Sequence, residues 1–112
     1  MGDIVKVYGL RNCDTCRKAI RSLGDAGREA VLVDVRETPL DDATRARFLG
    51  AFGDRVLNTR STTWRGLTEA ERAQPPLDLL AAHPALMKRP VIETGDGTLH
   101  LGWDATVKVS LL

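Results

Sequence analysis

Residues 4–35 carry the pattern that most constrains the fold of this chain. Residues 4–8 (IVKVY) are β-branched and mostly apolar, as in a buried strand. Residues 31–35 (VLVDV) form a second short apolar run of the same kind. Between them, apolar residues recur at helical spacing from Asp14 onward: Cys16, Ala19, Ile20, Leu23 and Ala26. Gly27 suits the end of that helix. A strand, a helix and a strand at this spacing predict a βαβ unit with a right-handed crossover.

The middle of the chain has a helical pattern. Residues 39–42 (PLDD) favour a helix start with acids in the first turn. The apolar stripe that follows consists of Ala43, Ala46, Phe48, Leu49 and Phe52, and Gly53 ends it. Thr68 and Glu71 match a capping box that opens a second helix. A third helix is expected over residues 77–82, after Pro75 and Pro76 and before Pro84.

The last third returns to strand patterns. Residues 91–94 and 98–101 flank Gly95-Asp96-Gly97, which predicts a hairpin. Asp104 fits the N-cap of a final helix, although Thr106, Val107 and Val109 would also suit a strand. We favour the helix.

Size and charge exclude several classes of function. The 112 residues fit one domain, and 16 basic against 15 acidic residues leave a net charge of +1. That balance argues against a direct nucleic-acid binder, which needs a clear basic excess. No apolar run approaches the ~20 residues that span a bilayer, and the N-terminus lacks a signal-peptide layout. We therefore expect a cytoplasmic protein that does not contact membranes.

The chain has two cysteines, and both lie in one tetrapeptide, Cys13-Asp14-Thr15-Cys16. A structural disulfide closing so small a loop would remove little entropy from the unfolded chain. A zinc ion needs about four ligands, and the two histidines, His83 and His100, are not spaced as ligands. We therefore expect no bound metal, and a redox or nucleophilic pair is the leading interpretation.

The predicted position of this pair explains how it would react. A thiol at the junction of a strand and a helix has its thiolate stabilised by unpaired N–H groups and the helix dipole. Cys13 would attack, and Cys16, nearly one turn further, would resolve a mixed disulfide. Arg17 adds positive charge, and Thr15 either donates to a bound anion or bonds its own backbone. The alternative is that Cys16 packs as a small core residue and Cys13 is an incidental surface thiol.

Three separated blocks of sequence together resemble the ArsC/Spx family of arsenate reductases, and most closely its YffB-like branch. They are residues 12–19 (NCDTCRKA), 57–65 (LNTRSTTWR) and 87–92 (MKRPVI). The resemblance implies an α/β, thioredoxin-like single domain over residues 1–112. Its order would be βαβ, a helical insertion over about residues 37–84, and ββα.

The resemblance also implies roles for individual residues. Cys13 corresponds to the nucleophile, and Arg60 and Arg89 correspond to oxyanion-binding arginines. Arginine suits that role because its planar fork pairs with two oxygens of an anion. Pro90 corresponds to a cis-proline that faces the thiol and presents backbone groups to an extended thiol substrate. In arsenate reductases of the family, glutathione and glutaredoxin complete the reduction. We therefore expect one of these as reductant and no bound cofactor.

Two departures from the family pattern bear on function. Gly102 stands about where the arsenate reductases carry a third arginine, which argues against arsenate as the physiological substrate. Cys16 is unlike the glutathione-dependent enzymes and resembles Spx, a redox-sensing regulator that binds RNA polymerase. The leading hypothesis is a thiol-dependent reductase. The alternatives are an Spx-like regulator and a family member with little turnover.

Overall fold

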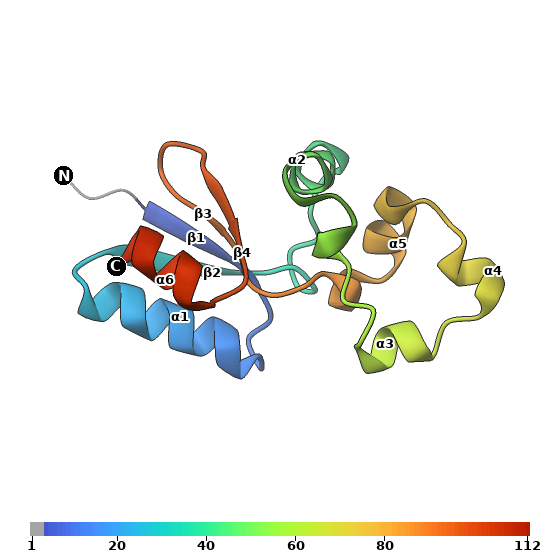
Figure 1. Cartoon of the computed structure of the whole chain (residues 1–112), viewed down its shortest axis with the longest axis horizontal. Helices are drawn as coiled ribbons and strands as arrows, with labels where there is room; N and C mark the ends of the chain where they lie inside the picture. The colour runs from blue at the N-terminus through green and yellow to red at the C-terminus, as the bar shows by residue number, and fades with distance from the viewer. Residues whose placement is uncertain (1–3) are drawn as a thin grey trace. The chain divides into compact units, whose positions relative to one another are not determined.

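The computed structural model describes residues 4–112, which divide into two units. The first unit contains residues 4–34 and 89–112 and holds a four-stranded mixed sheet (Figure 1). Its strands are β1 (Ile4–Gly9), β2 (Glu29–Asp34), β3 (Val91–Glu93) and β4 (Leu99–Leu101), in the spatial order β2-β1-β3-β4. β1 pairs parallel with β2 and antiparallel with β3, and β3 pairs antiparallel with β4. The βαβ unit and the hairpin predicted from the sequence are thus confirmed.

Two helices, α1 (Asp14–Asp25) and α6 (Ala105–Leu111), pack against one face of this sheet (Figure 1). Alternate strand residues point at them because successive side chains of a strand face opposite sides. The resulting core contains Val5, Val7, Cys16, Ala19, Leu23, Ile92, Val107 and Leu111. Cys16 is therefore part of the hydrophobic core of this unit.

The ends of these two helices follow local sequence signals. Asp104 caps α6, with its Oδ1 accepting from the N–H of Val107 at 3.0 Å, so the helix interpretation is confirmed and the strand alternative is wrong. α1 ends at Asp25, and Gly27 follows with a φ of 82°. Ala26, assigned to the apolar stripe from its spacing, is the C-cap of α1 and is exposed, because the helix ends before that residue can face the sheet.

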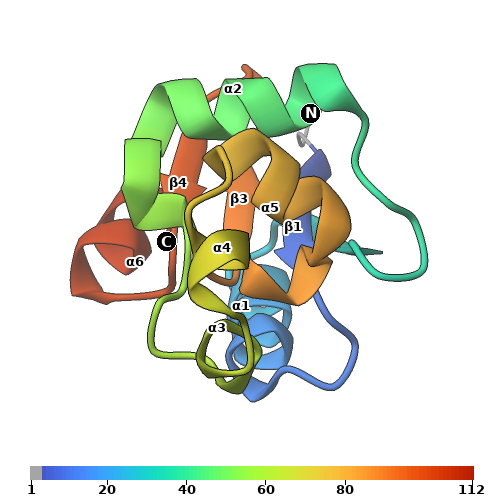
Figure 2. The same ribbon diagram turned by 90° about the vertical axis from the view of Figure 1, so that its right-hand side faces the viewer.

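The second unit, Val35–Lys88, is helical (Figure 2). It contains α2 (Asp42–Phe52), the 3₁₀ turn η1 (Gly53–Val56), α3 (Thr62–Arg65), α4 (Glu69–Arg72), α5 (Pro76–Ala82) and the 3₁₀ turn η2 (Pro84–Leu86). Its buried side chains are Val35, Phe48, Val56, Leu79, Leu80, Leu86 and Met87. The prediction of an insert over about residues 37–84 inside one domain stays a prediction.

The predicted apolar stripe of α2 is wrong in part. Phe48 is fully buried, but Ala43 and Ala46 are exposed. α2 packs against α5 through only part of its surface. Exposing the small side chain of an alanine to water costs little free energy.

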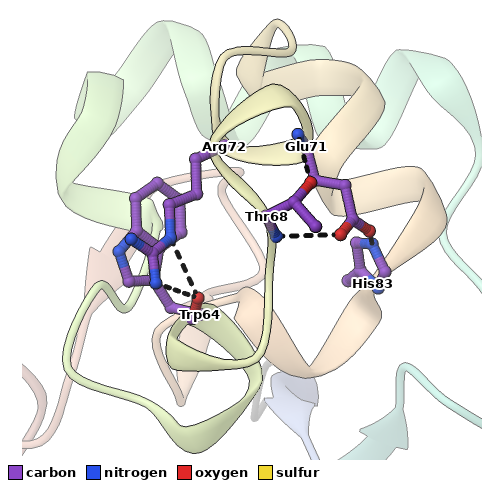
Figure 3. Close-up of polar contacts among 5 residues, drawn as sticks. All are labelled: Trp64, Thr68, Glu71, Arg72 and His83. Atoms are coloured by element: carbon purple, nitrogen blue, oxygen red, sulfur yellow. Dashed lines mark hydrogen bonds and ion pairs between the residues drawn. The ribbon is translucent and has the colours of Figure 1, made fainter.

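A group of polar contacts joins α3, α4 and the end of α5 (Figure 3). The predicted capping box is present: Glu71 N–H donates to Thr68 Oγ1 at 3.1 Å, and Thr68 N–H donates to Glu71 Oε1 at 2.9 Å. The guanidinium of Arg72 lies 5.4 Å from the centre of the Trp64 ring and donates to the Trp64 carbonyl. His83 Nε2 lies 3.9 Å from Glu71 Oε2. These contacts hold the three helices together. Helices this short are unstable in isolation, so each depends on such contacts with the others.

No helix among residues 4–112 is long and apolar enough to cross a membrane.

Candidate active site at the start of helix α1

Cys13 occupies the N-cap position of α1, directly after the turn that follows β1. Its backbone is extended, and its N–H donates to the Leu10 carbonyl at 3.1 Å, which fixes the turn. The partly buried thiol lies at the first turn of α1, whose N–H groups lack partners within the helix and whose dipole favours a negative charge.

The surroundings of Cys13 stabilise its thiolate. Partial burial raises the pKa of Cys13, but several donors more than offset that effect, and the pKa lies below its ordinary value. The Cys16 N–H and the Cys16 thiol donate to the sulfur, and the Arg89 guanidinium adds a further hydrogen bond and its positive charge. A lower pKa raises the share of the thiolate, which is the form that attacks disulfides and oxyanions.

Cys16 has the opposite character. It is fully buried, and burial raises its pKa to about 12, with a further increase from the neighbouring Cys13 sulfur. Cys16 therefore stays protonated beside the Cys13 thiolate and donates its S–H to that sulfur. Both cysteines are free thiols in the structure. One reactive and one protected thiol in contact is the arrangement that a resolving pair needs.

Gly9, the last residue of β1, makes room for Cys16. A Cβ atom at Gly9 would lie 2.2 Å from Cys16 Sγ, a separation that real Cβ atoms essentially never show. Gly9 lies just beyond residues 4–8, the strand predicted from the sequence, and this role was missed. A signal existed, because a glycine at a strand position often marks a close approach.

Arg89 and Pro90 precede β3 and bring a distant part of the chain to the same site. The peptide bond between Arg89 and Pro90 is cis, as predicted. Arg89 is partly buried and hydrogen-bonds to the Cys13 sulfur. Pro90 is fully buried, and its carbonyl accepts from the Gly102 N–H at 2.8 Å. The structure thus brings Cys13, Cys16 and Arg89 together. The Pro90 carbonyl already accepts a hydrogen bond from Gly102 of the same chain.

Thr15 and Arg17 are less closely tied to the thiols. Both are exposed in the first turn of α1. Arg17 Nη2 lies 3.7 Å from Asp14 Oδ1, one turn away on the same helix. An exposed pair of this kind contributes little to stability, so Arg17 can exchange its partner for a passing anion at little cost.

Arg60 belongs to the helical unit, Val35–Lys88, and lies just before α3. It is exposed, and its N–H donates to Asn58 Oδ1 at 3.1 Å. It lines a pocket of about 410 Å³ with Arg55, Leu57, Asn58, Thr59 and Lys88. Arg55 and Lys88 were missed by sequence reasoning, because nothing in their local sequence distinguishes them from other exposed basic residues.

Gly102 has a φ of 84°, in the left-handed region that favours glycine. An arginine at this position would be strained, so the backbone itself disfavours the third arginine of the arsenate reductases.

Comparison with known proteins identifies the family of the chain. The model of the ArsC family matches residues 8–107. The chain belongs to the ArsC family. A Haemophilus influenzae relative described only as an uncharacterized protein is 39% identical to this ArsC-family chain over 106 residues, which cover 90% of the chain and 92% of the relative.

Comparison with solved structures supports the same family assignment. A YFFB protein is 30% identical, with a TM-score of 0.86, and the match covers 96% of this chain and 98% of the other. An arsenate reductase (ArsC) related protein from Brucella melitensis is 35% identical with a TM-score of 0.74, over 98% of this chain and 93% of the other. These matches confirm the thioredoxin-like α/β fold and the YffB-like branch of the ArsC family.

Proposed function

We propose that this ArsC-family chain is a cytoplasmic thiol-dependent reductase in which Cys13 is the nucleophile. The observation that carries the proposal is the set of donors around the Cys13 sulfur, from Cys16 and Arg89, which lowers its pKa. Membership of the ArsC family and the likeness to arsenate-reductase-related structures support the same class of reaction.

The proposed substrate is a disulfide that carries an anionic group. The Cys13 thiolate attacks one sulfur of the disulfide, a mixed disulfide forms, and the other sulfur leaves as a thiolate that takes a proton from water. Arg89 would stay beside the reacting sulfur, and Arg60, Thr15, Arg17 and the backbone around Pro90 are proposed to bind the substrate. We favour a disulfide over arsenate because Gly102, with a φ of 84°, stands about where the family resemblance places a third oxyanion-binding arginine.

Cys16 is proposed to complete the cycle. Once Cys13 is in the mixed disulfide, its negative charge is gone, and the contribution of that charge to the high pKa of Cys16 disappears. Burial still keeps that pKa high, so the Cys16 sulfur attacks the Cys13 sulfur as its proton passes to the departing substrate sulfur. The Cys13–Cys16 disulfide forms, and the second half of the substrate leaves as a thiol. Two equivalents of glutathione, or one reduced glutaredoxin, supply the two electrons that restore both thiols.

A turnover assay tests this proposal. The substrate is the mixed disulfide of glutathione and 2-mercaptoethanol, which carries carboxylates, and its reduction by glutathione is measured for the wild type, Cys13→Ser and Cys16→Ser. We expect Cys13→Ser to abolish turnover. We expect Cys16→Ser to retain turnover that rises with glutathione, because glutathione must then resolve the adduct. Equal turnover in Cys13→Ser and the wild type would refute the proposal.

The contact between the two thiols also suits a redox switch, the second candidate function. In an Spx-like regulator, oxidation of Cys13 and Cys16 would change binding to RNA polymerase. A pull-down of polymerase that changes on oxidation in the wild type and not in Cys16→Ser would favour the regulator. Equal binding by the oxidised and reduced protein would exclude it.

A further inference from the structure

The turn between β1 and α1 carries the nucleophile and reaches the surface. Residues 10–12 separate the end of β1 from Cys13. Leu10 is buried, and the two residues after it are exposed. The Cys13 N–H donates to the Leu10 carbonyl at 3.1 Å, and this bond closes the turn on itself. Because the bond lies within the turn, a further contact is needed to tie the exposed part to the rest of the fold.

A carboxylate from β2 supplies that contact. Asp34, the last residue of β2, accepts from the Arg11 N–H through Oδ2 at 2.9 Å. β1 and β2 are parallel, so their carboxyl ends lie at the same edge of the sheet. Gly9 and Asp34 are partners in the register, which places Asp34 beside the start of the turn. A hydrogen bond from a backbone N–H to an ionised carboxylate is stronger than one between neutral groups.

The sequence around Asp34 carries a mark of this contact. Residues 31–35 (VLVDV) form an apolar strand pattern, and Asp34 is its one charged member. Asp34 is partly buried, and burying a carboxylate costs free energy unless hydrogen bonds offset the cost. The bond from the Arg11 N–H provides such an offset. An aspartate at this place therefore has a role that strand packing alone does not explain.

We propose that Asp34 is a positioning residue for the nucleophile: its carboxylate holds the turn that sets the Cys13 sulfur among its hydrogen-bond donors. This inference rests on the proposed function, in which Cys13 attacks the substrate. Asp34 acts through the backbone of Arg11 and takes no part in the bond changes. The donors to the Cys13 sulfur come from Cys16 and Arg89, so a shift of the turn would lengthen those hydrogen bonds.

Geometry and charge at Asp34 act on the Cys13 thiol with opposite signs. Loss of the tie weakens the donors and raises the pKa of Cys13, which lowers its reactivity near neutral pH. Loss of the negative charge alone lowers that pKa, because a carboxylate near a thiolate disfavours the ionised form. The direction of the shift therefore identifies which of the two effects governs the thiol.

Alkylation of Cys13 as a function of pH, followed by mass spectrometry in the full chain, tests this without any turnover. Asp34→Ala removes both the acceptor and the charge, and we expect the rate at neutral pH to fall about two- to fivefold, the scale of one hydrogen bond. Asp34→Asn removes the charge but keeps an acceptor oxygen at the same reach, so its rate should equal or exceed that of the wild type. Should Asp34→Ala not fold, Asp34→Ser, whose side chain is shorter, takes its place.

Asp41→Ala is the matched control. Asp41 Oδ1 accepts from the Thr44 N–H at 2.8 Å at the N-cap of α2, so this variant also removes a bond between a carboxylate and a backbone N–H. It should leave the alkylation of Cys13 unchanged.

Three results would each overturn the inference. Asp34→Ala could react as fast as the wild type, Asp34→Asn could slow the reaction as much as Asp34→Ala, or Asp41→Ala could do so. None of these readouts depends on turnover. They can therefore fail while Cys13→Ser still abolishes turnover, so the two proposals can fail separately.

Discussion

Replacing Gly9 by alanine is expected to destabilise the protein through one contact. The new Cβ would lie 2.2 Å from Cys16 Sγ, and 4.0 Å from the nearest side-chain atom of Arg89. The conflict therefore falls on a single, fully buried sulfur in the core. Overpacking of this kind typically costs about 1–3 kcal/mol. Gly9 has no left-handed φ, so the backbone adds no strain of its own.

A double variant isolates that contact. Cys16→Ala removes the sulfur, and the nearest remaining atom, Cys16 Cβ, lies 3.4 Å from the new Cβ, an ordinary contact. In the Cys16→Ala background, Gly9→Ala should therefore cost less than about 1 kcal/mol. The matched control is Gly24→Ala, on α1 with nothing within 4 Å, which should stabilise by about 0.5–1 kcal/mol.

Urea denaturation of the four proteins in the cycle, and of the Gly24→Ala control, measures these free energies of unfolding. Alkylation of Cys16 in native protein gives a second readout, because a displaced sulfur should react faster in Gly9→Ala. If Gly9→Ala costs the same with and without the Cys16 sulfur, the packing argument is wrong.

Three further predictions follow from individual contacts. Arg89→Gln should raise the pKa of Cys13 toward its usual value, because a hydrogen bond and a positive charge are lost; an unchanged midpoint of alkylation against pH would contradict this. Thr94 and Thr98 hold the pKa of Asp96 at about 2, below the unfolded value near ~4, so its stabilisation is complete above pH ~4 and is lost as the pH falls toward 2. Asp96→Asn should flatten that acid loss in thermal melts, and an identical slope would count against it. Thr68→Ala should lower the free energy of unfolding by about 1 kcal/mol in urea, because the cap of α4 is lost; unaltered stability would show that the box contributes nothing.

The elements that the sequence predicted are those set by local chemistry. Residues 4–8 have the alternation and β-branching of a strand, and Asp104 is a standard cap for the helix that follows it. The short helix α3 was missed, although Ser61 caps it by accepting from the Trp64 N–H at 3.1 Å. A four-residue helix carries too little periodicity to be recognised, and the cap was its one local signal.

In the candidate site, too, some features follow from the local sequence and others depend on tertiary packing. The N-cap position of Cys13 follows from the strand and helix beside it. Arg89 and Cys13 lie far apart in the sequence, and the structure brings them together. The family resemblance could predict this approach, whereas the local sequence pattern could not. The fit of Gly9 against Cys16, and the pairing that sets Lys88 beside Arg55, depend on tertiary packing that no local pattern records.

Alkylation of each thiol in native protein as a function of pH, followed residue by residue with mass spectrometry, tests the central claim most directly. The account predicts that Cys13 reacts with a midpoint below the ~8.5 of a free cysteine. Cys16, with a pKa of about 12, should stay unreactive throughout the accessible range. Equal reactivity of both thiols, with midpoints like those of an unfolded peptide, would contradict the account.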